Sequence, residues 1–221
     1  MKSQKDIIIQ LFENNREYLK LLGRAWEVLY FEGHSPDVGK RRENFIIQML
    51  KKEFNLNIIQ AADTEREWDF KIIREDGSER YYNLKTTEGY SILKLAWDGF
   101  PTVERILNFK FHYNILYVVG NRRTHTVEIS VISIDDLKGI QKKTTGETLE
   151  EYWWVPKSGT NPRGFGLNTK TVKMLVEKAK ERGDYIKMGY DPIPPAKINE
   201  LKDKYFEEWY ELIKRIAMGG K

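Results

Sequence analysis

Polar side chains interrupt a stretch that otherwise has the pattern of a core-forming β-hairpin. Asp69 lies on the first strand of this hairpin, and Asn83 and Lys85 lie two residues apart on the second. Because side chains alternate along a strand, Asn83 and Lys85 share one face and Leu84 points to the other. A buried polar group needs a partner, and a buried charge must be paired or bind a metal. Asp69 and Asn83 offer hard oxygen atoms, which suit Mg²⁺ or Ca²⁺, and Lys85 could pair with that site.

A third carboxylate, Glu43, precedes the hairpin on a predicted helix. It stands three to eleven residues before apolar side chains at helical spacing, Ile46, Ile47, Leu50 and Phe54. This spacing places Glu43 on the inward stripe of the helix, where it would join a metal site. The alternative interpretation is that Glu43 lies at the edge of the stripe and pairs with Lys40 or Arg42.

The elements that must position these groups follow from hydrophobic periodicity. Helices are predicted over residues 3–30, 36–54, 101–108, 168–181 and 196–218. Strands are predicted over 56–60, 68–74, 80–86, 115–120 and 126–134, with Asp76-Gly77 as a two-residue hairpin turn. Residues 135–163 are predicted to have irregular structure. The pattern predicts an α/β (α+β) fold with a mixed central sheet flanked by helices.

Composition and missing motifs exclude several classes of protein. The chain has 221 residues, 37 basic against 33 acidic, for a net charge of +4, and no cysteine. It therefore has no disulfides or thiolate zinc sites, which fits a cytoplasmic protein. No apolar run approaches the roughly 20 residues of a membrane helix. A P-loop and a GxSxG elbow are absent from the sequence, which argues against P-loop nucleotide binding and an α/β-hydrolase.

The segments WDF and NLKTT, joined by a hairpin, resemble the PD-(D/E)XK nuclease superfamily and, within it, the type II restriction endonucleases. The resemblance covers residues 37–134 and implies a restriction-endonuclease-like core of helix, three-strand meander, helix and strand, here with added N- and C-terminal helices. The first acid of the motif matches Asp69, its lysine matches Lys85, and the helix glutamate of many members matches Glu43. The second acidic position holds Asn83, a departure that some restriction enzymes of the family share.

The resemblance implies Mg²⁺-dependent hydrolysis of phosphodiester bonds. Asp69, Asn83, the backbone carbonyl of Leu84 and Glu43 would hold the metal. Lys85 would orient or help to deprotonate the attacking water and contact the scissile phosphate. A catalytic set of Glu43, Asp69, Asn83 and Lys85 follows. Two alternatives stay open: a structural Asp69–Lys85 ion pair, and a different register that uses another nearby acid, Asp63, Glu65 or Glu67.

Basic residues gather where DNA contacts are expected. Residues 152–180 contain six basic side chains and one acid, and Lys40, Arg41 and Arg42 form a second cluster. In the glycine-containing loop 158–168, three side chains are predicted to read base edges, Asn161, Arg163 and Asn168. Lys170 and Lys173 on the next helix are predicted to hold phosphates, as are Arg41 and Arg42. The alternative is a surface loop followed by a solvated helix face.

The expected organisation is a single domain over residues 1–221. It consists of a nuclease core (37–134), a DNA-recognition region (135–195) and a closing C-terminal helix (196–221). The expected partner is double-stranded DNA, bound by a homodimer, because cutting both strands of a palindrome suits two-fold symmetry. The competing functions are a repair or junction nuclease of the same superfamily, and a DNA-binding module that lost catalysis through Asn83.

Overall fold

The computed structural model describes residues 5–32, 38–62, 65, 67–96, 101–156, 164–194 and 209–219. Its helices are α1 (Ile7–Asn14), α2 (Arg16–Glu32), α3 (Val38–Lys52), α4 (Val103–Asn108), α5 (Ile134–Lys142), α6 (Leu149–Tyr152), α7 (Thr169–Arg182) and α9 (Trp209–Ala217). Its strands are β1 (Ile58–Gln60), β2 (Phe70–Ile73), β3 (Glu79–Thr87), β4 (Leu93–Ala96), β5 (Asn114–Asn121), β6 (Thr126–Ile132), β7 (Trp153–Trp154), β8 (Phe165–Leu167) and β9 (Tyr185–Gly189).

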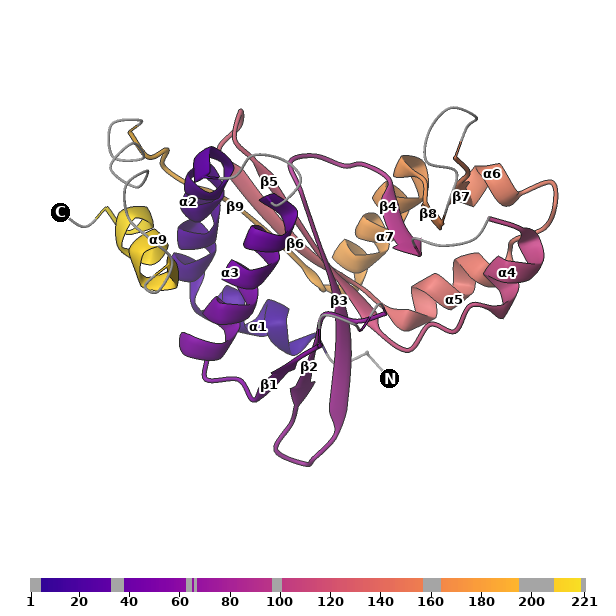
Figure 1. The fold of residues 1–221 in the computed structure, drawn as a ribbon, viewed down its shortest axis with the longest axis horizontal. Coiled ribbons are helices and arrows are strands. Elements are labelled where there is room, and N and C mark those ends of the chain that lie inside the picture. Colours follow the sequence, from indigo (N-terminus) through magenta and orange to yellow (C-terminus); the bar gives the residue numbers. More distant parts are fainter. Residues whose placement is uncertain are drawn as a thin grey trace.

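A mixed six-stranded sheet runs through the middle of the molecule in the order β1-β2-β3-β5-β6-β9 (Figure 1). Strands β1, β2 and β3 form an antiparallel meander, β3 and β5 are parallel, and β6 and β9 continue antiparallel. The parallel pair needs a crossover, and α4 lies within it. The predicted α+β class, with a mixed sheet flanked by helices and a meander before the crossover, is confirmed.

The two faces of the sheet are covered by different layers (Figure 1). Helices α1, α2, α3 and α9 bury one face, where Leu84 of β3 joins their apolar side chains. Helices α4, α5 and α7 bury the other face together with the small sheet β4-β8-β7, and here Ile115 and Tyr117 of β5 point into the core. Because successive residues of β3 alternate between these layers, the neighbours of Leu84 face the second layer.

The predicted N-terminal helix over residues 3–30 is wrong in one respect. The described part is two helices, α1 and α2, separated at Asn15, whose φ of −132° and ψ of 66° are not helical. The Asn15 side chain donates a hydrogen bond from Nδ2 to the Leu11 carbonyl at 2.9 Å. Asparagine competes in this way with the helical backbone, and the break lets two short helices cover the sheet.

The prediction of irregular structure for residues 135–163 is also wrong. Helix α5 begins after Ser133, whose Oγ accepts a hydrogen bond from the Asp136 N–H at 3.2 Å, and it buries Leu137 and Ile140. Helix α6 and strand β7 follow. Trp153 is 1% exposed and belongs to the second core layer.

Other differences concern short strands and turns. The hairpin between β2 and β3 has a longer loop than predicted: Arg74 donates its N–H to the Ser78 carbonyl at 2.9 Å around three residues, and Gly77 has a φ of 77°. Strands β4, β8 and β9 were not predicted, and β9 completes the central sheet from within the region assigned to DNA recognition. Of the predicted closing helix, the structure describes α9.

Among the described helices, none combines the length and apolar character that a bilayer crossing needs.

Candidate active site

The site begins where β2 and β3 part. Their register ends at the pair Phe70↔Tyr82, whereas β3 continues alongside β5 as far as Thr87. On the side that β2 has left, the Leu84 N–H donates a hydrogen bond to Asp69 Oδ2 at 2.6 Å. The Asp69 carboxylate therefore takes the place of a strand partner. Because the N–H and C=O of one strand residue point to the same side, the Leu84 carbonyl also faces this opening.

Asn83 and Lys85 lie on one face of β3, as their spacing predicts. Their partners on β5, Ile115 and Tyr117, both belong to the second core layer. Asn83 is 5% exposed, and its Nδ2 donates a hydrogen bond to the Glu67 carbonyl at 3.0 Å. Among the described residues, Asn83 Oδ1 has no hydrogen-bond partner although it is buried. The orientation of an amide is assigned from such contacts, and this one leaves an oxygen available to a ligand.

Glu43 of α3 faces the same site. Burial raises the pKa of Glu43 to about 7, the negative charge of Asp69 adds to the rise, and the charges of Lys85 and Lys40 oppose it. Glu43 and Asp69 also line a common cavity of about 40 Å³, together with Lys40 and Trp68. The structure thus brings Glu43 within electrostatic reach of Asp69 and Lys85. The four predicted catalytic side chains come from α3, the residue before β2 and the middle of β3.

Helix α3 is fixed over the end of β3 by contacts of two residues that precede Glu43. The hydroxyl of Thr86 donates a hydrogen bond to the Gly39 carbonyl at 3.5 Å. Arg42 is 6% exposed and forms an ion pair with Glu88 at 2.6 Å, and its guanidinium lies 4.5 Å from the centre of the Trp26 ring. These contacts hold the helix that carries Glu43 against the strand that carries Lys85.

The donor set fits a hard divalent cation. Asp69 and Glu43 supply carboxylates, Asn83 supplies a buried oxygen without a protein partner, and the Leu84 carbonyl faces the opening. Within the described ranges, no three His, Cys, Asp or Glu side chains gather as a metal site would require. Mg²⁺ is often bound by one or two carboxylates, with water and substrate phosphate completing the octahedron. The residues therefore match Mg²⁺ better than zinc, which takes nitrogen or sulfur ligands.

The alternative acids lie differently from Asp69. The Glu67 carboxylate lies 3.2 Å from His112 Nε2, and more than half of the Glu67 side-chain surface is exposed. Glu65 is exposed and accepts a hydrogen bond from the Glu67 N–H at 2.9 Å. Asp63 lies outside the described residues. Of the acids that the structure describes here, Asp69 is the one that bonds to β3 beside Lys85.

The residues that were predicted to contact DNA differ in exposure and in their contacts. Lys170 and Lys173 are exposed on α7, and Arg41 is partly exposed on α3. Arg42 cannot reach a phosphate without leaving Glu88 and Trp26. Asn161 and Arg163 lie outside the described residues.

Asn168 has a structural role at the start of α7. Its Oδ1 accepts a hydrogen bond from the Thr171 N–H at 2.9 Å and caps the helix. Its Nδ2 donates to the carbonyls of Glu150 and Glu151 at 3.0 and 2.7 Å. Both amide hydrogens are engaged, so reading a base would require this cap to open.

The glycines beside Asn168 allow a close approach between strands. A Cβ on Gly164 would lie 2.0 Å from the Ala96 carbonyl oxygen, and a Cβ on Gly166 would lie 2.3 Å from the Leu93 carbonyl oxygen. Gly164 also has a φ of 90°. The structure uses these two glycines to seat β8 against β4.

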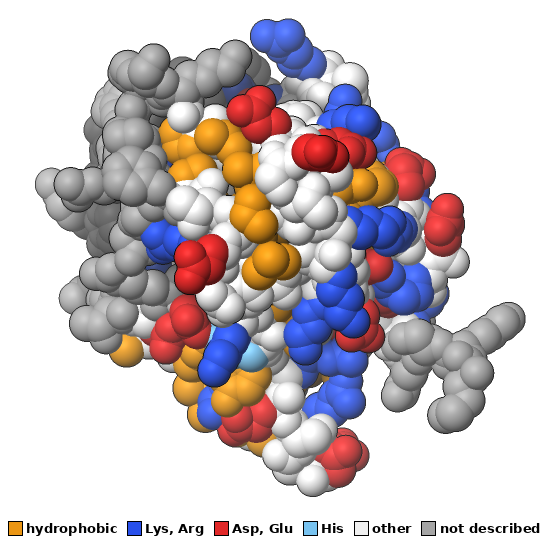
Figure 2. All heavy atoms as spheres, turned by 90° about the vertical axis from the view of Figure 1, so that its right-hand side faces the viewer, with side chains coloured by type: hydrophobic (Ala, Val, Ile, Leu, Met, Phe, Trp, Pro, Cys, Tyr) orange, Lys and Arg blue, Asp and Glu red, His pale blue; other side chains and the backbone are white. Residues whose placement is uncertain are grey.

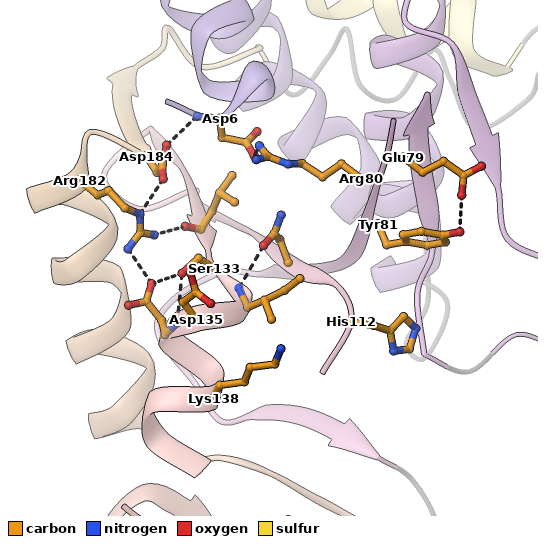
Figure 3. A pocket seen from close by; sticks show the side chains of 14 residues that line it. Asp6, Glu79, Arg80, Tyr81, His112, Ser133, Asp135, Lys138, Arg182 and Asp184 are labelled. Carbon is orange, nitrogen blue, oxygen red and sulfur yellow. Dashed lines mark hydrogen bonds and ion pairs between the residues drawn. The ribbon is translucent and has the colours of Figure 1, made fainter. Parts of the chain in front are cut away.

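A larger cavity, of about 580 Å³, lies away from this site near the beginnings of β3 and β5 (Figure 3). Five of its charged side chains are paired with one another. Arg80 contacts Asp6 at 2.6 Å, and Arg182 contacts Asp136 and Asp184 at 2.7 and 2.8 Å. This network joins the start of α1, β3, α5 and the end of α7, which indicates a structural role. Size alone therefore does not identify the active site.

The surface seen from the right-hand side of Figure 1 carries charges of both signs. Lys and Arg side chains gather in one part of this face, with Asp and Glu between them (Figure 2). A mixed surface of this kind favours local phosphate contacts over binding by a continuous basic face.

Comparison with known proteins supports the fold. A scan against protein-family models and a search of the curated proteins find no match. A search of the solved structures finds a "Restriction endonuclease in complex with substrate DNA", with a TM-score of 0.58 and 20% sequence identity. The match covers 93% of this chain and 93% of that chain. At this identity the likeness shows the fold: the chain has a restriction-endonuclease-like fold along most of its length.

Proposed function

We propose that this protein is a Mg²⁺-dependent endonuclease of the PD-(D/E)XK superfamily that cuts double-stranded DNA at a specific sequence, as a type II restriction enzyme does. The observation that carries the proposal is the Asp69 carboxylate bonded to β3 between Asn83 and Lys85, with Glu43 opposite. The likeness to a restriction endonuclease in complex with substrate DNA supports it.

Asp69, Asn83 Oδ1 and the Leu84 carbonyl are the groups that would hold Mg²⁺, and Glu43 would hold a second ion or a metal-bound water. When bound, the metal lowers the pKa of water and offsets charge on the phosphate in the transition state. Hydrolysis forms a bond from the water oxygen to phosphorus and breaks one phosphodiester P–O bond. The residues that act directly on the reacting groups are then Lys85 and Glu43.

The ammonium group of Lys85 would donate hydrogen bonds to the scissile phosphate and orient the attacking water. A preorganised positive charge of this kind stabilises the transition state more than the ground state. The pKa of Glu43, raised to about 7, lets its carboxylate accept a proton from water near neutral pH. The Asp69 charge that raises this pKa would be partly neutralised by the metal, so metal binding and ionisation of Glu43 should favour each other.

Incubation of the purified protein with phage DNA and Mg²⁺ tests the proposal. We expect discrete fragments whose ends share one sequence, and no cleavage in EDTA. Cleavage confined to branched or damaged DNA would instead support a repair or junction nuclease. Binding without cleavage, in any divalent metal, would support a DNA-binding module inactivated at Asn83.

The assembly and the sequence reader are part of the same proposal. We propose a homodimer, because two equivalent active sites can cut both strands of a palindromic site. Sedimentation of the protein with and without its DNA site tests this. We keep Arg163 as the proposed reader of a guanine, with Lys170 and Lys173 at phosphates. Arg163→Ala should then reduce the gap between cognate and non-cognate binding.

A further inference from the structure

Tyr113 is a fully buried residue immediately before β5. It is 0% exposed, and its ring packs edge-on to His112, with 5.3 Å between ring centres. The parallel register pairs Asn114 with Tyr82 and Ile115 with Asn83. Because side chains alternate, Tyr113 lies on the same face of the sheet as Ile115, and therefore on the face of Asn83.

The Tyr113 hydroxyl belongs to the neighbourhood of Asp69. Nε2 of His112, the preceding residue, lies 3.2 Å from the Glu67 carboxylate, and the Glu67 carbonyl accepts the hydrogen bond from Asn83 Nδ2 at 3.0 Å. Burial raises the pKa of Tyr113, and the negative charges of Glu67 and Asp69 raise it further. The phenol therefore stays protonated and acts as a hydrogen-bond donor.

Two buried polar atoms in this neighbourhood have no hydrogen-bond partner among the described residues, the Tyr113 hydroxyl and Asn83 Oδ1. One is a donor and the other is an acceptor. Leaving both unsatisfied costs free energy that a shared water molecule recovers. A phenylalanine at position 113 would fill the same space without this cost, so the hydroxyl has a use.

That use follows from the asymmetry of the Asn83 side chain. A carboxylate presents an oxygen to a metal in either orientation, whereas an amide turned by 180° presents an NH₂ group. One restraint on the amide is the hydrogen bond from Nδ2 to Glu67. A second restraint on Oδ1 would hold the oxygen toward the cation position.

We propose that Tyr113 is a positioning residue of this site: its hydroxyl donates a hydrogen bond to one ordered water, which donates to Asn83 Oδ1 and fixes the amide with its oxygen toward the metal. The inference rests on the proposed function, because Asn83 is a metal ligand there. It adds Tyr113, a residue outside the family motif. Asn83 needs such a residue because its amide, unlike a carboxylate, presents an oxygen in one orientation only.

The test compares Tyr113→Phe with Tyr190→Phe. Tyr190 is a control remote from the site, since it is a tyrosine with 6% exposure that follows β9, at the opposite edge of the sheet from β1. The probe is Mg²⁺ alone, titrated while the melting temperature is recorded. We expect Tyr113→Phe to raise the half-saturating Mg²⁺ concentration at least fivefold without lowering the metal-free melting temperature. Tyr190→Phe should leave that concentration unchanged.

A second pair of variants separates positioning from packing. In an Asn83→Asp background the ligand is symmetrical, so Tyr113→Phe should change the half-saturating Mg²⁺ concentration by less than twofold. Equal shifts in both backgrounds, or equal behaviour of Tyr113→Phe and Tyr190→Phe, would overturn the inference. So would a high-resolution crystal structure with no water between the two atoms. The proposed function fails separately, if wild-type protein binds Mg²⁺ but does not cut DNA.

Discussion

The Asp69 carboxylate accepts a hydrogen bond from the main-chain N–H of Leu84 at 2.6 Å, at the point where β2 no longer pairs with β3. This bond fixes the position of an acid relative to both neighbours of Leu84. The strand geometry then places Asn83 and Lys85 on one face beside the acid, and the Leu84 carbonyl on the open side. A carboxylate, an amide and an ammonium group are thus arranged by a single break in strand pairing.

Asp69→Asn should abolish cleavage while the protein stays folded. The asparagine oxygen can still accept the Leu84 N–H, so the hydrogen bond is kept while the charge that holds the metal is lost. We expect the cleavage rate to fall by at least about a hundredfold, the scale of one lost electrostatic contact in a transition state. Cleavage assays and melting temperatures measure the two effects. Glu67→Gln is the control, and retained activity in Asp69→Asn would assign the metal to a different acid.

Lys85→Ala should lower the cleavage rate by at least about a hundredfold, through loss of charge stabilisation at the phosphate. Binding of DNA should change much less, because the lysine acts on the reacting group. Single-turnover rates and binding constants separate these effects. A large fall in melting temperature with little change in rate would instead support the structural ion pair between Lys85 and Asp69.

Sequence patterns predict the placement of Asn83, Lys85 and Glu43 better than that of the surrounding elements, for physical reasons. Alternation along β3 depends only on the strand itself, so the shared face of Asn83 and Lys85 follows from a spacing of two. Helical spacing likewise placed Glu43 on the inward side of its helix. The break between β2 and β3 arises from tertiary packing and has no sequence signal, so the bond from Leu84 to Asp69 could not be foreseen.

Two residues that the sequence assigns to DNA contacts show the same limit of prediction from local pattern. Arg42 and Asn168 have side chains that suit DNA, yet one is buried between Glu88 and Trp26 and the other caps α7. Tyr113 has no motif around it, and only the parallel register of β3 and β5 brings it to the face of Asn83. A local signal existed for α5, where Ser133 precedes a helical spacing of apolar residues.

Glu43 should make stability depend on pH in the direction opposite to that of an ordinary acid. Its pKa rises from 4.5 to about 7 on folding, chiefly through burial, so the folded state binds the proton more tightly. Its stabilisation is full below pH 4.5 and is lost as the pH rises through about 7, at a cost of about 3 kcal/mol at most. Denaturant unfolding between pH 5 and 8 should show this slope in wild-type protein and lose it in Glu43→Gln. An unchanged slope would contradict the assignment.

Arg42→Ala should act on stability and not on DNA contacts. The substitution leaves Glu88 with Arg122, which contacts it at 2.9 Å, and removes the cation from the Trp26 ring. Since Glu88 is partly exposed, we expect the free energy of unfolding to fall by about 2 kcal/mol, less than for a fully buried pair. Denaturant unfolding measures it. A variant of normal stability whose DNA affinity falls and whose salt dependence weakens would restore Arg42 as a phosphate contact.

Lys173→Ala should act on DNA binding and not on stability. Lys173 is exposed on α7, so its loss should leave the melting temperature unchanged. If it contacts a phosphate, the affinity for cognate and non-cognate DNA should fall equally, and the slope of log K against log salt should weaken by about one unit. Lys138→Ala is the matched control, because Lys138 is an exposed lysine on α5 beside the larger cavity (Figure 3). Binding measured at several salt concentrations distinguishes the two variants. Equal slopes for both would remove the exposed face of α7 from the DNA interface and assign the phosphate contacts to another surface.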